Sequence, residues 1–320
     1  MGAARAVTGG GTRAAPPVAA GGARPVVAVA MSTYNGADHV VAQLESALSQ
    51  DGVDVRVYVR DDGSTDGTLD VLSPYERAGE IVLVRGRNLG VVGSFMELLS
   101  LVPSDVPYVA LCDQDDVWHP DKLARALAVV GEKDPRVPRA YCSEYVFCDA
   151  DMVPQGRSHL NRSGVDFARM LYENVTSGNT MVLNRALVDC VTAAGREGVY
   201  CHDWWIALVA CAVGELVYDD FCSLEYRRTG SNASPTGSSG LALLRYRVRT
   251  FLAGGELARV TEQLRKLDAC LGGRMDDERR ALLRRFVDGG RLAKALAPVR
   301  LRQTLAAEAA LRAMFLLGML

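Results

Sequence analysis

The chain has 320 residues, of which 49% are apolar, so it is long enough to bury a sizeable hydrophobic core. Its formal net charge is only −2, but the charge is unevenly distributed. Residues 241–320 contain 16 Lys and Arg against 8 Asp and Glu, a surplus of +8 that leaves −10 for residues 1–240. An acidic front with a basic tail argues against a nucleic-acid-binding protein. It fits a metal-using domain joined to a segment that meets an anionic surface.

The cysteines and the apolar runs indicate the compartment. Eight cysteines are scattered along the chain without a Cys-x-x-Cys pair, which argues against a zinc site and fits buried thiols in a reducing cytosol. No uninterrupted apolar run approaches the roughly 20 residues that span a bilayer, and the amino terminus lacks the apolar core of a secretion signal. We therefore expect a cytoplasmic protein.

The first half of the chain predicts an α/β fold. Residues 1–24 contain little besides Ala, Gly, Arg and Pro and predict a disordered tail. Residues 26–31 are a continuous apolar run, typical of a buried parallel strand. Strands and helices then alternate, which predicts a mostly parallel sheet with right-handed crossovers. Further strands are expected at 55–59, 81–84 and 108–111. Helices are expected at 37–50, 91–101 and 120–130, with a short helix after Thr68 that ends at Ser73.

The second half is more mixed up to about residue 230. We expect strands at 140–148, 215–218 and 223–228, a loop entering a strand at 176–183, and helices at 185–194 and 203–213. Residues 231–240 are rich in Ser, Gly, Asn and Pro and predict a mobile loop or linker. The expected organisation is therefore a tail at 1–24, one α/β domain at 25–230 and a helical basic extension at 241–320.

The most informative stretch is Leu111-Cys-Asp-Gln-Asp-Asp-Val-Trp118, in which an apolar strand leads into three carboxylates. Asp113, Asp115 and Asp116 repel one another at a strand end unless a cation or hydrogen-bond donors neutralise them. The alternate spacing lets Asp113 and Asp115 point to the same side of an extended chain, which suits an oxygen-ligated divalent metal. The alternative is a solvated acidic turn, and the cluster alone does not separate the two.

A second acidic corner, Asp61-Asp-Gly-Ser-Thr-Asp-Gly-Thr68, follows the second strand. It matches a calcium-binding loop only in part, because the twelfth position would be Ser73 instead of Glu and no helix precedes it. The alternatives are a plain turn and a nucleotide site, in which a carboxylate accepts from a pyrimidine N3–H or from ribose hydroxyls. Ser32 and Tyr34 follow the first strand at the neighbouring corner, where Tyr34 could pack on a flat base.

Four motifs follow one another along the chain, and each closes a strand: Ser-x-Tyr-Asn-Gly, Asp-Asp-Gly-Ser-Thr-Asp, Asn-Leu-Gly and Asp-Gln-Asp-Asp-x-Trp. Over about residues 26–230 the chain resembles the family 2 glycosyltransferases, which have the GT-A fold. The Asp-Gln-Asp-Asp-Val-Trp variant looks most like the rhamnosyltransferases of bacterial cell-surface polysaccharide assembly. The resemblance implies an inverting enzyme that uses a nucleotide-activated sugar and Mg²⁺ or Mn²⁺.

The resemblance also implies roles for single residues. Asp115 matches the metal-binding acid of the Asp-x-Asp element, and Asp113 matches a position on the donor side and is the second candidate metal ligand. Asp203 lies in His202-Asp-Trp-Trp205 and matches the catalytic base, although the pattern alone favours a simple helix N-cap. The implied positions for the nucleotide sugar are Ser32, Tyr34, Asp61, Asp62, Asn88, Asp113, Gly178, Asn179 and Arg227.

One position departs from the family pattern. Tyr226-Arg-Arg-Thr-Gly-Ser-Asn232 resembles Tyr-Arg-x-His-x-x-Asn, but Thr229 stands where His is usual. The role of that His would pass to Arg227 or Arg228, or the chain would be a non-catalytic GT-A homologue that binds nucleotide or glycan as a scaffold. A nucleotidyltransferase, the other alternative, would need a Gly-rich loop directly after the first strand, where this chain has Ser32-Thr-Tyr-Asn.

The basic tail has two interpretations, a solvated helical face that packs back on the domain or an amphipathic segment on a membrane surface. Leu241–Leu252 mixes Arg with apolar residues, and residues 313–320 are almost entirely apolar. We favour a glycosyltransferase at the inner face of the cell membrane that moves rhamnose from dTDP-rhamnose. Its expected partners are a nucleotide-diphosphate sugar donor, a glycan or lipid-linked glycan acceptor and an anionic membrane surface, with no nucleic acid.

Overall fold

The computed structural model describes residues 23–131, 133–228 and 255–319. Nearly all of the predicted tail at 1–24 and the whole predicted linker at 231–240 lie outside these residues. Thr229 and the stretch Leu241–Leu252 also lie outside them.

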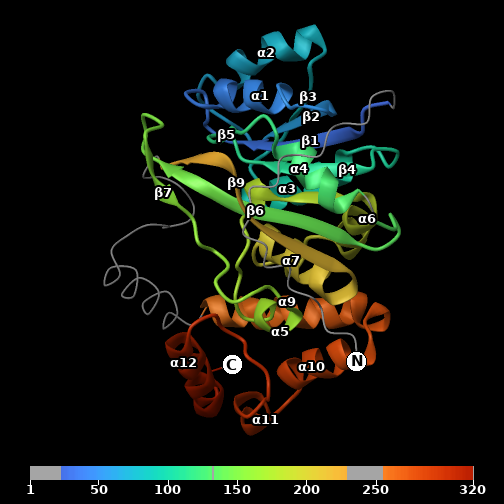
Figure 1. Ribbon diagram of the computed structural model, residues 1–320, viewed down its shortest axis with the longest axis vertical. Helices are drawn as coiled ribbons and strands as arrows, with labels where there is room; N and C mark the ends of the chain where they lie inside the picture. Colours follow the sequence, from blue (N-terminus) through green and yellow to red (C-terminus); the bar gives the residue numbers. More distant parts are fainter. Residues whose placement is uncertain (1–22, 132, 229–254, 320) are drawn as a thin grey trace.

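The described strands form one mixed sheet in the order β3-β2-β1-β4-β8-β6-β9-β5, with β7 paired to β6 (Figure 1). The strands are β1 (Val26–Thr33), β2 (Asp54–Asp61), β3 (Ile81–Arg85), β4 (Tyr108–Cys112), β5 (Val117–Trp118), β6 (Arg139–Cys148), β7 (Pro154–Arg157), β8 (Val182–Asn184) and β9 (Glu215–Arg227). β1 to β4 are parallel to one another, β6 is parallel to β9, and β8 runs antiparallel to both β4 and β6. The carboxyl ends of β1, β2, β4, β6 and β9 therefore meet at one edge, where open α/β sheets bind their ligands.

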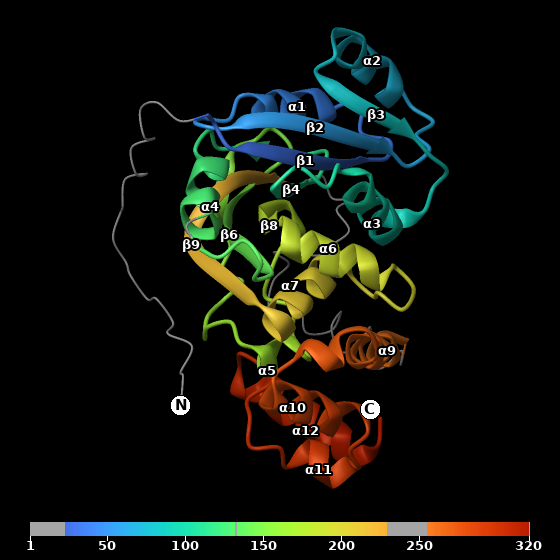
Figure 2. The ribbon, with the colours of Figure 1, turned by 90° about the vertical axis from the view of Figure 1, so that its right-hand side faces the viewer.

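Helices cover both faces of this sheet (Figure 2). One face carries α1 (Val40–Leu48), α2 (Thr68–Ala78) and α4 (Lys122–Val130), and the other carries α3 (Gly90–Leu101), α6 (Arg185–Ala194) and α7 (His202–Val213). β1 explains why two faces are covered, because Val27, Val29 and Met31 enter one core while Ala28 and Ala30 enter the other. The predicted α/β class with a mostly parallel sheet and helices after it is confirmed.

The carboxyl-terminal helices pack against the α/β part and share its core. They are α9 (Gly255–Leu271), α10 (Asp277–Val287), α11 (Arg291–Ala295) and α12 (Leu305–Leu317), and the short α5 (Phe167–Met170), η1 (Gly178–Thr180) and η2 (Gly272–Arg274) complete the described helices. α9 packs on α7, and Tyr172 contacts the rings of Phe286 and Phe315 at centroid distances of 5.5 and 5.3 Å. No helix in the described parts of the chain has both the length and the apolar run needed to cross a bilayer.

Two predicted boundaries are wrong. α2 continues through Pro74 to Ala78 instead of ending at residue 73, because Leu72 is fully buried and anchors the helix on the sheet while Pro74 faces outward. The two strands expected at 215–218 and 223–228 are the single strand β9, which pairs along the whole of β6. Register shifts between Ser143 and Val146 absorb the polar middle of β9, and sequence periodicity does not reveal such shifts.

Candidate active site

Three carboxylates come together at the carboxyl edge of the sheet. Asp113 and Asp115 are half-buried in the loop between β4 and β5, and Asp203 lies in the first turn of α7. Burial, followed by the negative charges of Asp115 and Asp203, raises the pKa of Asp113 to about 7. Burial also raises the pKa of Asp115. Half-buried carboxylate oxygens that repel one another are the donor set that a hard divalent cation prefers, so these residues fit Mg²⁺ or Mn²⁺.

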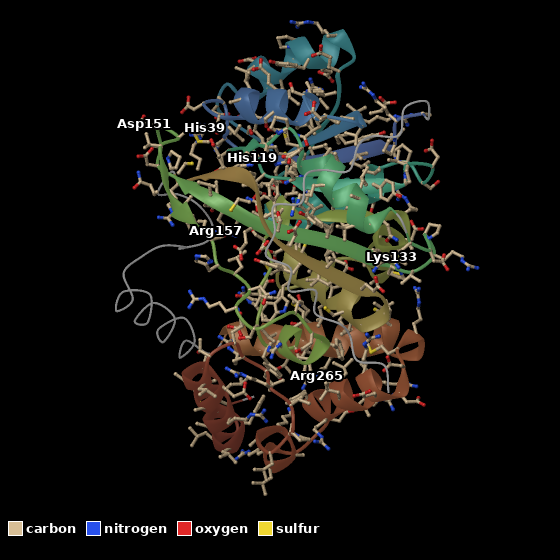
Figure 3. The ribbon with its side chains drawn as sticks, in the orientation of Figure 1. His39, His119, Lys133, Asp151, Arg157 and Arg265 are labelled. Carbon is tan, nitrogen blue, oxygen red and sulfur yellow. The ribbon has the colours of Figure 1, made fainter. Side chains whose placement is uncertain are left out.

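This edge faces one side of the molecule. Figure 3 labels His39, which follows the β1 corner, and Asp151, which follows β6, and both lie on that side. A backbone hydrogen bond, followed by the neighbouring His39 and Arg227, opposes the rise in the pKa of Asp115. Arg227, at the end of β9, also donates from Nε to the backbone oxygen of Asp115 at 3.2 Å and from Nη1 to that of Ala150 at 2.6 Å.

The third acid of the cluster belongs to a buried network. Asp116 has no exposed surface, and its Oδ2 accepts from Nδ2 of Asn179 at 2.5 Å. The ammonium of Lys122, which is also fully buried, donates to the backbone oxygen of Asn179 and lies 3.9 Å from the ring centroid of Trp118. Burial lowers the pKa of Lys122 to about 7, although the charges of Cys112, Asp116 and Asp113 oppose this. Asn179 therefore links the buried cation to the buried acid and joins two loops of the site.

A side-chain amide fixes the acidic loop to the corner after β1. Gln114 accepts from the backbone N–H of Tyr34 at 2.8 Å and donates to the backbone oxygen of the same residue at 3.1 Å. Gly36 leaves room for this contact, since a Cβ there would lie 2.5 Å from Cδ of Gln114 and would push that side chain aside. The Tyr34 side chain stays 46% exposed at this corner and is available for a ligand.

The two acids after β2 have separate structural partners. Asp61 holds its own turn, because it accepts from the N–H groups of Gly63 and Ser64 and from the hydroxyls of Thr33 and Ser64 at 2.5 to 3.2 Å. Asp62 is buried and accepts from Arg60 and from two backbone N–H groups at the start of α3, at 2.7 and 2.9 Å. Their roles in base binding stay predictions. In the structure both carboxylates accept hydrogen bonds that fix the backbone of the loop after β2 and of the start of α3.

The remaining nucleotide-side residues lie on the same edge. The Ser32 hydroxyl is hydrogen-bonded to that of Ser94 on α3 at 2.6 Å, and this bond ties the end of β1 to the helix. Asn88 is exposed, and its Oδ1 accepts from the N–H of Gly90 at 3.0 Å. Both residues therefore border the corner that Asp62 organises.

Asp203 is not the N-cap that the pattern alone favours. α7 begins at His202 with Cys201 as its N-cap, so Asp203 lies inside the first turn, where the helix dipole stabilises a carboxylate. Its Oδ1 accepts from the N–H of Trp204 at 2.6 Å and from the Cys201 thiol at 2.8 Å. Burial and the charge of Asp203 raise the pKa of the Cys201 thiol, so it remains a protonated donor.

The neighbours of Asp203 form a second cluster that suits a metal less well. The ligand atoms of Cys201, His202 and Asp203 lie within 4.8 Å of one another. The imidazole of His202, however, is buried and stacked on Phe95 at 4.3 Å, and its pKa is lowered by burial. A protonated thiol and an enclosed ring are poor partners for a hard cation. Gly178 lies against this ring, because a Cβ there would be 2.8 Å from Nε2 of His202.

The family model described as "Glycosyl transferase family 2" matches residues 28–190, which is half of the chain. The chain belongs to glycosyl transferase family 2. The matched region contains the corners of Asp62 and Asp113 as well as Asn179, and it ends before Asp203 and Arg227.

Individual relatives of this family 2 chain are distant. It is 32% identical to the dTDP-rhamnosyl transferase RfbG of Shigella flexneri over 102 residues, which are 30% of this chain and 35% of that protein. It is 28% identical over 161 residues to the Escherichia coli UDP-Glc:alpha-D-GlcNAc-diphosphoundecaprenol beta-1,3-glucosyltransferase WfaP, which are 50% of this chain and 61% of that protein. The chain spans about a third to a half of the length of the first curated relatives it matches.

A solved structure supports the fold. TarS 1-349 of S. aureus in complex with UDP-GlcNAc superposes with a TM-score of 0.51 at 15% identity, over 92% of this chain and 90% of that one. At this identity the likeness shows the GT-A fold alone.

Three residues of the family 2 site were missed by the sequence analysis. Gln114 clamps the acidic loop, Lys122 supplies the buried cation, and Cys201 donates to Asp203. Gln114 lies inside the predicted Asp-Gln-Asp-Asp motif, and Lys122 lies at the start of a predicted helix. The sequence did not show which distant residues they contact, and those contacts define their roles. Trp204 and Trp205, which follow Asp203 in the motif, are both buried in the core.

Proposed function

We propose that the chain is a metal-dependent inverting glycosyltransferase of cell-surface polysaccharide biosynthesis. It moves rhamnose from dTDP-rhamnose to a lipid-linked glycan. The observation that carries the proposal is the convergence of Asp113, Asp115 and Asp203, where the last two raise the pKa of the first through their charges. The donor is supported by the similarity to a protein named dTDP-rhamnosyl transferase, and the lipid-linked acceptor by the diphosphoundecaprenol in the name of the Escherichia coli relative.

Asp203 acts as the general base in this proposal. Within the described residues both hydrogen bonds that it accepts end on Oδ1, which leaves Oδ2 for the acceptor hydroxyl. As the acceptor oxygen bonds to the anomeric carbon, its proton passes to Asp203 and the bond from that carbon to the diphosphate oxygen breaks. Attack opposite the leaving group inverts the configuration of the anomeric carbon.

The other residues hold the donor. Asp115, with Asp113 beside it, would bind Mg²⁺ or Mn²⁺, and a cation bound there supplies positive charge that balances the departing diphosphate. The base and ribose side is formed by the corners of Ser32, Tyr34, Asp61, Asp62 and Asn88. Gly178, Asn179 and Arg227 border the diphosphate and the acceptor.

The test is release of nucleoside diphosphate. The protein is incubated with Mg²⁺ or Mn²⁺, a lipid-linked acceptor and a panel of nucleotide sugars, and we expect release from dTDP-rhamnose that stops when the metal is chelated. Asp203→Asn should lower kcat by about 10²- to 10⁴-fold with donor affinity unchanged, because only the proton transfer is lost. Asp115→Asn should instead weaken donor binding in the presence of the metal.

Asp189→Asn is the matched control, since this acid lies 62% exposed on the neighbouring α6 and should leave turnover unchanged. Normal turnover by Asp203→Asn would disprove the base assignment. Donor binding without diphosphate release, for any sugar and acceptor, would favour the non-catalytic scaffold that the Thr229 departure suggests.

A further inference from the structure

The outward face of α12 carries no polar side chain. A helix on a protein surface normally turns charged and polar residues to the solvent. In α12 every exposed residue is instead leucine or alanine, although the helix is thirteen residues long. The exposed residues are Leu305, Ala306, Ala309, Ala310, Ala313, Leu316 and Leu317.

The charged residues of α12 are used on the inner side. Glu308 accepts from the backbone N–H groups of Leu301 and Arg302, both at 2.8 Å. Arg312 is paired with Glu308 and donates to four carbonyl oxygens, two at the end of α11 and two in the connection that precedes α12. Both side chains are more than four-fifths buried, so they fix the connection and leave the outer face apolar.

The neighbouring helix adds to the apolar surface. α11 packs on α12 at the end of the molecule farthest from β3, and both views agree on this (Figures 1 and 2). Leu292 and Leu296 are exposed there, and Met319 follows α12. With Leu305, Leu316 and Leu317 they make up six of the eleven large apolar side chains that are exposed in the described chain, and the five leucines are 49% to 76% exposed. We call these six residues, together with the exposed alanines of α12, the α11–α12 face.

The charge around this face is positive. Residues 289–319 contain five basic residues and one acidic residue, the inward-facing Glu308. Three of the five bases do not present charge on the surface, because Lys294 is buried and Arg302 and Arg312 are paired with acids. Arg291 is exposed, and its guanidinium lies against Gly318 at the carboxyl end of α12. Arg300 is exposed in the connection before α12. Large apolar side chains beside two exposed arginines match the boundary between acyl chains and anionic headgroups.

We propose that the α11–α12 face docks the protein on an anionic lipid bilayer. The leucines enter the headgroup boundary, and Arg291 and Arg300 meet the lipid phosphates. A second copy of the chain is a poorer occupant, because two faces of the same positive charge repel each other. The inference deepens the proposed function and rests on it for its purpose, since a lipid-linked acceptor is met at a bilayer, but docking is measured without turnover.

The experiment measures partitioning of the full chain onto vesicles of phosphatidylglycerol and phosphatidylcholine, compared with vesicles of phosphatidylcholine alone. We expect binding to the anionic vesicles that falls with added salt. Leu316→Ser/Leu317→Ser should lower the partition coefficient by about tenfold or more, because two exposed apolar anchors are lost. Arg291→Glu should weaken binding to the anionic vesicles and leave binding to the neutral ones unchanged. The control is Val82→Ser/Leu101→Ser, which alters two exposed apolar residues on β3 and α3 and should bind like the wild type.

Two results would overturn the proposal. One is equal binding of anionic vesicles by the wild type and by the Leu316→Ser/Leu317→Ser variant, or no binding by either. The other is a wild-type dimer in sedimentation that this variant dissociates, which would assign the face to a second copy. Diphosphate release with a soluble acceptor and no vesicles should be the same for this variant and the wild type, so failure of docking and failure of catalysis are separable.

Discussion

The buried Lys122 offers a test of how the acidic loop is held. Lys122→Met keeps most of the volume but removes the cation. Asp116 then remains buried, and among the described residues its side chain accepts a hydrogen bond from Asn179 alone, on one oxygen. Removal of one partner from a directly contacting buried charge pair costs about 3–5 kcal/mol. Asn179 lies between Lys122 and Asp116, so the lower end of this range applies, and loss of the contact with the Trp118 ring adds to it. Burial already raises the pKa of Asp116 well above its usual range, so proton uptake by that acid lowers the cost. We expect a loss of about 3 kcal/mol in the free energy of unfolding.

The measurement is urea unfolding followed by far-UV circular dichroism. The double variant Lys122→Met/Asp116→Asn removes both charges and should be more stable than the sum of the single losses predicts, by about 2 kcal/mol. Lys133→Met is the matched control, because Lys133 is 47% exposed and pairs with Glu215 at the surface, and it should cost less than about 1 kcal/mol. Single losses that add to within about 0.5 kcal/mol in the double variant would refute the idea that these buried charges compensate each other.

Two further predictions concern the corners of the sheet edge. Gly36→Ala should lower kcat/KM by about tenfold in steady-state kinetics, since its Cβ would displace the Gln114 clamp. Gln114→Ala removes the same clamp, so the double variant Gly36→Ala/Gln114→Ala should lose no more than either single variant. Asp61→Ala should lower the free energy of unfolding in urea by about 2–4 kcal/mol, because two N–H donors and two hydroxyl donors lose a charged acceptor. A decrease below about 0.5 kcal/mol would show that this turn does not depend on the carboxylate.

Much of the fold follows from local patterns. The continuous apolar run of β1 predicts a strand buried on both faces, and the periodic run at 185–194 predicts α6 with its observed bounds. Long-range pairing is what local patterns lack. β5 is only two residues long and exists because it pairs with β9, more than a hundred positions later in the chain. β9 is one strand because β6 shifts register beside it.

The same division holds for the α12 surface. The sequence shows that residues 305–320 are largely apolar, which agrees equally with a buried helix and with a surface helix. Only packing decides that Leu311, Met314 and Phe315 face the core while a row of leucine and alanine faces outward. The inward use of Glu308 is also a tertiary result, because its backbone partners lie outside the helix.

The sequence by itself determined which residues can carry chemistry, because acids placed directly after apolar strands must collect at one edge of a parallel sheet. The tertiary structure decided which of those acids stay available. Asp115 and Asp116 are adjacent and chemically identical, yet Asp116 is fully buried against Asn179 while Asp115 remains half-buried at the edge. The physical reason is that burial and hydrogen-bond partners come from residues more than sixty positions away, and no pattern within the motif contains them.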